Sequence, residues 1–268
     1  MDHPAATAVA LLGLPTDEAA SATRGAAEGP AAIRAALYDK ASNLNSEPGL
    51  NLGCESRLAD IGDLELSGGD ATRAEIESGV AAELERGCRV LSLGGDHSVT
   101  YPILRAYGER FESLTVVQID AHPDLYDNFE GDRYSHACPF ARVMEEELAT
   151  RLVQIGIRAA TAHQLEQAKR FGVEIVPRGH WLDFVTLELE PPVYLSIDLD
   201  GLDPAYAPGV SHLEAGGLTS RELLEIIWRL PGLIGADIVE LNPSRDVGGI
   251  TAALAAKLVK ELVPRLLE

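Results

Sequence analysis

Short apolar runs alternate along the chain with longer segments in which apolar positions repeat at helical spacing. The short runs are typical of buried strands, and they predict strands over residues 8–14, 89–93, 114–119, 152–155, 193–197 and 233–241. The longer segments predict helices over residues 29–38, 71–86, 98–108, 135–147, 161–171, 219–230 and 249–266. Strand, helix, strand is therefore the repeating unit.

The central runs are apolar on both faces, as in the segments 114–119 and 193–197. Strands of this kind belong in the middle of a parallel sheet that helices cover on each side. The sequence thus predicts an α/β fold with three layers, α/β/α. No linker or abrupt change of charge divides the chain, so a single domain over residues 1–268 is expected. Ligands of such sheets bind beyond the carboxyl ends of the strands.

The strand over residues 89–93 ends in Gly94-Gly95-Asp96-His97. Two glycines allow a tight turn that would present His97 at the end of the strand. Taken alone, the same residues could be a glycine turn in which Asp96 caps a helix.

Polar residues also follow two other predicted strands. Asp120, His122 and Asp124 occupy alternate positions just after residue 119, and their side chains share one face if the segment stays extended. Asp198 and Asp200 likewise occupy alternate positions just after residue 197. Such polar groups lose hydration at the end of a buried strand, and a bound cation would compensate them.

Together with His97, these residues offer four carboxylates and two imidazoles, enough for two metal ions that share bridging acids. The donor set contains no thiolate, which favours Mn(II), although imidazole also admits Co(II), Ni(II) or Zn(II). Two ions about 3.5 to 4 Å apart lower the pKa of water until hydroxide forms at neutral pH. A GxSxG nucleophile motif and a GxGxxG dinucleotide motif are both missing from the sequence.

Composition limits the kinds of molecule that the protein is expected to bind and the compartment in which it is expected to work. The formal charge of -20 disfavours nucleic acid and anionic membrane surfaces as partners, whereas small cations remain compatible. An apolar fraction of 46% argues against both a disordered chain and a membrane protein. The odd number of cysteines, without CxxC spacing, fits a reducing compartment. A cytoplasmic location is therefore expected.

At these motifs the chain resembles the ureohydrolase family of arginase and agmatinase, whose signatures are a GGDHS box, a DAHxD box and an SxDxDxxDP box. All three occur here in that order, and the similarity continues through residues 209–212, 216–219 and 237–243. Segments 120–137 and 208–212 are most similar to plant-type arginases, which in turn resemble agmatinases.

The resemblance implies an eight-stranded, mostly parallel sheet, two Mn(2+) ions per subunit and a trimeric or hexameric assembly. The implied ligands of one ion are His97, Asp120, Asp124 and Asp198, and those of the other are His122, Asp120, Asp198 and Asp200. Glu240 would pair with the guanidinium of the substrate, and His136 would carry protons. Asp124 could also relay a proton to the leaving amine.

Two departures bear on the substrate. Tyr126 stands where animal arginases carry an asparagine that recognises the amino-acid end of the substrate. His212 replaces a threonine, so it could contact the substrate or simply fill the pocket wall.

The expected reaction is hydrolysis of a guanidino C–N bond, which releases urea from a small cationic substrate. L-arginine would give ornithine, and agmatine would give putrescine. Guanidinobutyrate, guanidine and formiminoglutamate are further candidates. Two other classes stay open: a deacetylase-like amidohydrolase with a single zinc ion, and a binding or regulatory protein that retains the fold.

Overall fold

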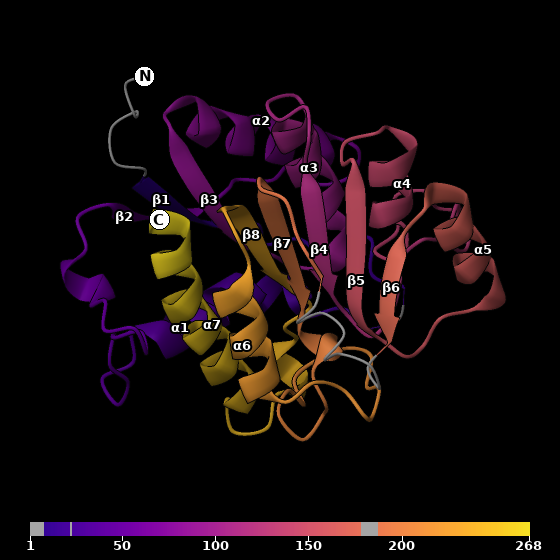
Figure 1. Ribbon diagram of the computed structural model, residues 1–268. Coiled ribbons are helices and arrows are strands. Elements are labelled where there is room, and N and C mark those ends of the chain that lie inside the picture. Colours follow the sequence, from indigo (N-terminus) through magenta and orange to yellow (C-terminus); the bar gives the residue numbers. More distant parts are fainter. Residues whose placement is uncertain (1–7, 22, 178–186) are drawn as a thin grey trace.

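A sheet of eight parallel strands runs through the computed structural model, which describes residues 8–21, 23–177 and 187–268 (Figure 1). In spatial order the strands are β2 (Leu58–Asp63), β1 (Ala8–Gly13), β3 (Cys88–Leu93), β8 (Leu233–Val239), β7 (Val193–Asp198), β4 (Thr115–Ile119), β5 (Arg151–Ile157) and β6 (Glu174–Pro177). All paired strands run parallel, so their carboxyl ends meet at one edge of the sheet.

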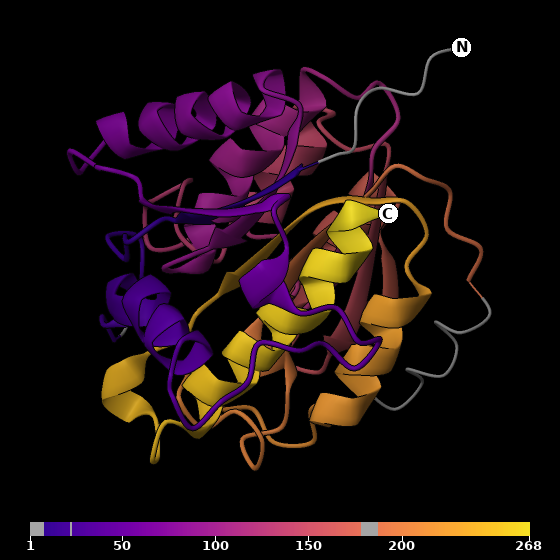
Figure 2. The same cartoon turned by 90° about the vertical axis from the view of Figure 1, so that its left-hand side faces the viewer.

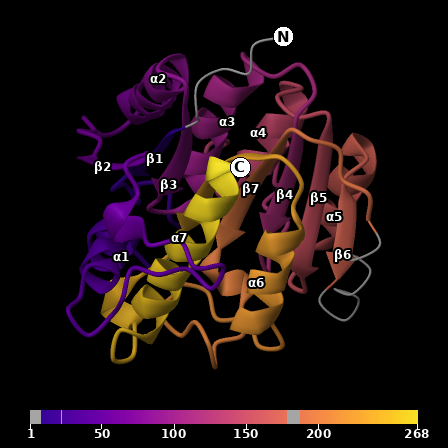
Figure 3. The ribbon, with the colours of Figure 1, turned by 60° about the vertical axis from the view of Figure 1, so that its left-hand side comes forward.

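Two layers of helices enclose the sheet, which confirms the three-layer prediction (Figure 2). The helices of one layer are α1 (Gly29–Leu37), α6 (Ser220–Arg229) and α7 (Ile250–Leu267). The helices of the other are α2 (Ala71–Glu85), α3 (Thr100–Gly108), α4 (Pro139–Glu145) and α5 (Ala162–Phe171). Helix α7 contacts both α1 and α6, between which it lies (Figure 3). Within the described ranges, no helix is long and apolar enough to cross a membrane.

All six predicted strands are present, and two further strands form the edges of the sheet. Strand β2 contains only half-buried and exposed residues, since just one of its sides is paired. Strand β6 has only four residues. Edge strands of this kind lack the continuous apolar run that marks a central strand, which is why the sequence pattern did not predict them.

Several predicted boundaries differ from the structure by one or more residues, and three of these errors lie next to a residue of the site. The strand over 233–241 ends at Val239 because Glu240 has a φ of 65°, outside the extended range. The helix over 135–147 begins only at Pro139, the first helical position, where the fixed φ of proline is favourable. The helix over 98–108 begins at Thr100, after a 3₁₀ turn over His97–Val99. His97, His136 and Glu240 therefore lie beyond the strands and outside the α-helices.

Candidate metal centre

A cavity of about 210 Å³ opens at the carboxyl ends of the central strands. Its lining combines four acids and three histidines with aromatic and small neutral residues. The lining residues are Ser21, His122, Asp124, Tyr126, Phe129, His136, Ala137, Ala159, Gln164, Asp198, Asp200, His212 and Glu240.

Three carboxylates surround one ring nitrogen of the fully buried His97. Its Nδ1 atom lies 3.0 Å from Asp124 Oδ2, 3.1 Å from Asp120 Oδ2 and 3.3 Å from Asp198 Oδ2. Two ligand atoms that each lie about 2.1 Å from one cation, at right angles, would be about 3.0 Å apart. These separations therefore fit donors that converge on a single ion.

A second group of donors surrounds His122, whose Nδ1 atom lies 3.0 Å from Asp200 Oδ2 and 3.6 Å from Asp120 Oδ1. Asp120 is common to both groups, with one carboxylate oxygen facing each histidine. The structure thus brings together all six residues predicted as metal ligands, with Asp120 in the position of a bridging carboxylate.

The charges of these residues are poorly compensated by the protein alone. Burial and the charge of Asp120 raise the pKa of Asp124 to about 6. Burial and the neighbouring carboxylates Asp200 and Asp120 raise the pKa of Asp198 well above its ordinary value. Burial opposes protonation of His97, yet hydrogen bonds to the three carboxylates raise its pKa. Two divalent cations would supply the missing positive charge, so the donor set fits such ions.

Close backbone packing holds His97 at the end of β3. A Cβ atom on Gly95 would lie 1.7 Å from the carbonyl oxygen of Thr16, so only glycine fits there. The carbonyl of Gly95 accepts a hydrogen bond from the amide of Glu240 at 2.8 Å. Asp96 accepts from the amide of Ser98, which is the helix-capping role that the sequence suggested.

Arg158 fixes the loop that carries Asp200. Its guanidinium donates to the carbonyl oxygens of Asp200 and Glu214, both at 2.6 Å, and to that of Leu202 at 3.2 Å. One planar side chain thereby ties the turn after β7 to the segment around Glu214.

Beside the metal-ligand candidates, His136 forms a chain of polar contacts. Its Nδ1 atom lies 3.0 Å from Glu240 Oε1, and its Nε2 atom lies 2.8 Å from the hydroxyl of Ser21. Burial lowers the pKa of His136, but the hydrogen bond and charge of Glu240 outweigh burial and raise this pKa to about 9. In return, His136 lowers the pKa of the buried Glu240 against the effect of burial. The pair is therefore an imidazolium and a carboxylate at neutral pH.

The remaining predicted residues, Tyr126 and His212, form the walls of the cavity. The ring of His212 lies 5.4 Å from that of His136 and 5.9 Å from that of His122. Tyr126 stacks on His163 at 5.6 Å and contacts Phe129 at 5.0 Å. Both walls are thus rigid ring surfaces next to the acids.

Sequence reasoning missed a row of buried polar residues beneath the candidate metal centre. This polar row consists of Ser92, Asp237, Ser196, Gln118 and Gln154, which lie in register on β3, β8, β7, β4 and β5, each fully buried. Gln118 donates to Asp120 Oδ2 at 2.6 Å, and Gln154 donates to Gln118 Oε1 at 2.6 Å. The available signal was one polar residue near the end of each otherwise apolar strand.

Ser21 and Gln164 were also missed, because isolated serine and glutamine residues carry no motif. Ser21 contacts His136 from a segment more than one hundred positions earlier in the chain. Gln164 lines the cavity while its Oε1 atom accepts from the amide of Thr161, as part of the capping box of α5.

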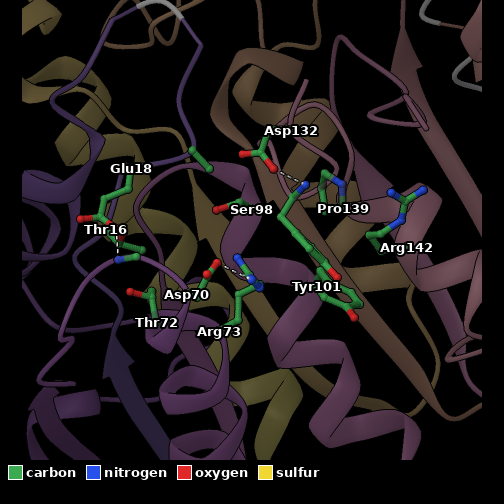
Figure 4. Close-up of a pocket in the computed structure, with 13 residues that line it drawn as sticks. Thr16, Glu18, Asp70, Thr72, Arg73, Ser98, Tyr101, Asp132, Pro139 and Arg142 are labelled. Atoms are coloured by element: carbon green, nitrogen blue, oxygen red, sulfur yellow. Dashed lines mark hydrogen bonds and ion pairs between the residues drawn. The ribbon is translucent and has the colours of Figure 1, made fainter. Parts of the chain in front are cut away.

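A neighbouring cavity of about 220 Å³ lies beside the segment 16–19 (Figure 4). Both arginines in its lining form ion pairs, Arg73 with Asp70 and Arg142 with Asp127. The guanidinium of Arg73 also covers the ring of Tyr134 at 4.0 Å. Among the described residues of this cavity, no acid and histidine side chains converge as they do in the candidate metal centre.

Comparisons with known proteins agree with the geometry. The family model described as Arginase family matches residues 7–264. Arginase 1, mitochondrial, from Oryza sativa subsp. indica is 42% identical over 274 residues, which cover 96% of this chain and 81% of the relative. Agmatinase, mitochondrial, from Gallus gallus is 37% identical over 272 residues, or 95% of this chain and 79% of the relative.

A solved structure of arginase from Medicago truncatula superimposes with a TM-score of 0.92 at 40% sequence identity. The match covers 98% of this chain and 89% of that one. The eight-stranded α/β/α fold implied by the sequence motifs is therefore confirmed.

The expected cytoplasmic location is corrected by these relatives. Plant arginases from Oryza sativa, Arabidopsis thaliana and Medicago truncatula are named mitochondrial or chloroplastic, which points away from the cytoplasm. The prediction rested on cysteine usage, and free thiols report a reducing environment rather than a particular compartment.

Proposed function

Because the chain belongs to the Arginase family, we propose that it hydrolyses a guanidino C–N bond of a small cationic substrate and releases urea. The observation that carries the proposal is the convergence of six metal-ligand candidates beside the cavity that the buried Glu240 lines. The ligand candidates suit hydrolysis, and the buried acid suits a cationic substrate.

Two Mn(2+) ions per subunit are the proposed cofactor, with Co(II), Ni(II) or Zn(II) as chemically compatible substitutes. We assign one ion to His97, Asp120, Asp124 and Asp198, and the other to His122, Asp120, Asp198 and Asp200. When bound, such a pair of ions lowers the pKa of water and so supplies the nucleophile at neutral pH.

Glu240 is the proposed partner of the substrate guanidinium. Its carboxylate is 4% exposed and is held ionised by His136, so a cation that enters the cavity meets a fixed negative charge. A planar guanidinium donates two parallel hydrogen bonds to a carboxylate, which would orient the carbon toward the acids of the metal centre.

His136 is the proposed proton donor and carrier, and Asp124 is the proposed relay from the attacking water. One water molecule adds to the guanidino carbon, the bond from that carbon to the alkylated nitrogen breaks, and the products are urea and a protonated amine. The contact of His136 Nε2 with Ser21 gives the imidazole an exposed polar partner.

L-arginine is the first proposed substrate, supported by plant arginase relatives at 42% identity. Agmatine is the second candidate, and the cavity lining favours it: among the described lining residues there is no lysine or arginine to pair with a carboxylate. Tyr126 and His212 are the proposed contacts of the substrate beyond the guanidinium.

Urea release by the manganese-loaded protein from L-arginine, agmatine, guanidinobutyrate and guanidine, each assayed separately, tests the reaction. We expect urea from L-arginine or agmatine. Formamide from formiminoglutamate, with no urea from any guanidine, would overturn the assignment while leaving the metal centre intact. Hydrolysis of an acetylated amine with one bound zinc would instead identify a deacetylase-like enzyme.

We also propose that the protein assembles as a trimer or hexamer, as the family resemblance implies. Light scattering on the purified protein tests the assembly independently of the reaction, and a monomeric mass would contradict it.

A further inference from the structure

We propose that Asp237 and Ser196 are positioning residues that set which ring nitrogen of His97 carries a proton. The inference rests on the proposed function, because it concerns how the chain prepares His97 for a cation. Both residues belong to the polar row and neither contacts the cavity.

The three residues form one continuous hydrogen-bonded chain. The hydroxyl of Ser196 lies 2.9 Å from His97 Nε2 and donates to Asp237 Oδ1 at 2.7 Å. The adjacent strands β7 and β8 place Ser196 and Asp237 directly opposite each other. Asp237, Ser196 and His97 are all fully buried, so water does not offer alternative partners.

The protons available to Asp237 and Ser196 determine which group donates in each of these hydrogen bonds. Burial raises the pKa of Asp237, but its Oδ2 atom accepts the hydroxyls of Tyr194 at 2.8 Å and Thr100 at 3.1 Å, and with Ser196 these three hydroxyl donors stabilise the ionised form. An ionised carboxylate has no proton to give, so the single proton of Ser196 points at Asp237. The oxygen of Ser196 can then only accept from His97, which places a proton on Nε2.

The consequence for His97 is an unprotonated Nδ1 atom in the holoenzyme. This nitrogen is buried and faces the carboxylate oxygens of Asp120, Asp124 and Asp198 at 3.1, 3.0 and 3.3 Å. The edge contact between His97 and Phe140, with ring centroids 5.2 Å apart, fixes the plane of the imidazole. Ring orientation and proton position together aim a lone pair at the candidate metal centre.

The chain offers a matched control for Ser196. Ser92 is a second fully buried serine of the polar row, on β3, and it lies opposite Asp237 on the other side of β8. Its hydroxyl has no hydrogen-bond partner. Replacement by alanine removes the same atom from the same depth of the sheet in both cases, but only Ser196→Ala breaks the chain to His97.

Metal binding by the purified holoenzyme tests the proposal. Wild type, Ser196→Ala and Ser92→Ala are dialysed against graded free Mn(II), and bound metal per chain is measured by mass spectrometry of the elements. We expect Ser196→Ala to hold one of its two ions about 10- to 100-fold more weakly, whereas Ser92→Ala matches wild type. Equal affinities in all three proteins, or equal losses in both variants, would overturn the proposal.

The number of metal ions that the wild-type protein binds distinguishes a failure of this inference from a failure of the proposed function. A wild type that binds fewer than two ions contradicts the metal centre itself, whereas normal wild-type binding without an effect of Ser196→Ala contradicts only the positioning role. Should Ser196→Ala fail to fold, nitrogen NMR of the zinc-loaded wild type labelled at histidine decides. A protonated Nε2 on His97 supports the proposal, and a protonated Nδ1 overturns it.

Discussion

The Nδ1 nitrogen of His136 lies 3.0 Å from the Oε1 oxygen of Glu240, and both side chains are buried in the same cavity. The same Glu240 oxygen accepts from the backbone amide of His97 at 3.0 Å. One carboxylate thus connects the proposed proton carrier to the backbone of a proposed metal ligand. Its φ of 65° shows that the chain holds this acid in a left-handed conformation, which favours glycine.

The ion pair between His136 and Glu240 predicts a loss of stability at alkaline pH. The pKa of His136 is raised to about 9 in the folded protein, above its usual value near 6.5 in an unfolded chain. A histidine whose pKa is raised on folding stabilises the folded state. Its full contribution to the free energy of unfolding is present below about pH 6.5 and is lost as pH rises through about 9. We expect a loss of roughly 3 kcal/mol over this window, measured by urea unfolding of chelator-treated protein.

The variant His136→Asn isolates this effect from other titrations. Its free energy of unfolding should lie below that of wild type at pH 6 and approach it at pH 10. A difference between the two proteins that is independent of pH would contradict the ion pair.

Glu240→Gln should weaken the action on guanidines without abolishing the fold. Glutamine keeps the size of the side chain but removes the negative charge that would face the substrate. Because hydrogen bonds to charged groups contribute about 1.5–3 kcal/mol, kcat/KM for the preferred guanidine should fall by roughly 10- to 150-fold. Glu166→Gln, on the exposed face of α5, is the control and should match wild type. Equal kcat/KM for Glu240→Gln and wild type would exclude the proposed role.

Gly95→Ala should destabilise the protein severely. The new methyl group would lie 1.7 Å from the carbonyl oxygen of Thr16, and neither can rotate away, because the oxygen belongs to the backbone and the backbone fixes the position of Cβ. We expect a loss of at least about 3 kcal/mol in chemical unfolding, or no soluble protein. In Gly79→Ala the methyl meets only the flexible end of Leu64, at 2.9 Å, so this variant should stay near wild type. Similar stabilities of the two variants would refute the packing argument.

Arg158→Lys should loosen the loop that carries Asp200. Lysine keeps the charge but lacks the planar fork that reaches the carbonyls of Asp200, Leu202 and Glu214 together. The expected cost is about 1–3 kcal/mol, since buried carbonyls lose donors, together with weaker metal binding. Arg170→Lys alters an arginine whose side chain contacts Gln167 within its own helix, and it should change stability by less than about 0.5 kcal/mol. An unchanged melting temperature for Arg158→Lys would contradict the proposed role of the Arg158 hydrogen bonds.

The sequence was sufficient for the central architecture and for the residues that lie in motifs. Central strands are apolar on both faces and are therefore visible as runs, and Asp120, His122, Asp198 and Asp200 follow such runs directly. The edge strands β2 and β6 were missed because pairing on a single side leaves little hydrophobic signal.

Other features of the site depend on register and long-range packing. The polar row exists only because β3, β8, β7, β4 and β5 align one polar position each, and no single strand reveals that alignment. Ser21 meets His136 across 115 positions of sequence. The positive φ value at Glu240 likewise arises from surrounding contacts rather than from local preference, because glutamate rarely adopts that conformation.

Anomalous diffraction from manganese-loaded crystals tests the central claim most directly. The account predicts two anomalous peaks per chain, one among His97, Asp120 and Asp124 and one among Asp120, His122 and Asp200, where the ligand atoms already converge. A single peak, or no peak among these side chains in protein that still releases urea, would contradict it.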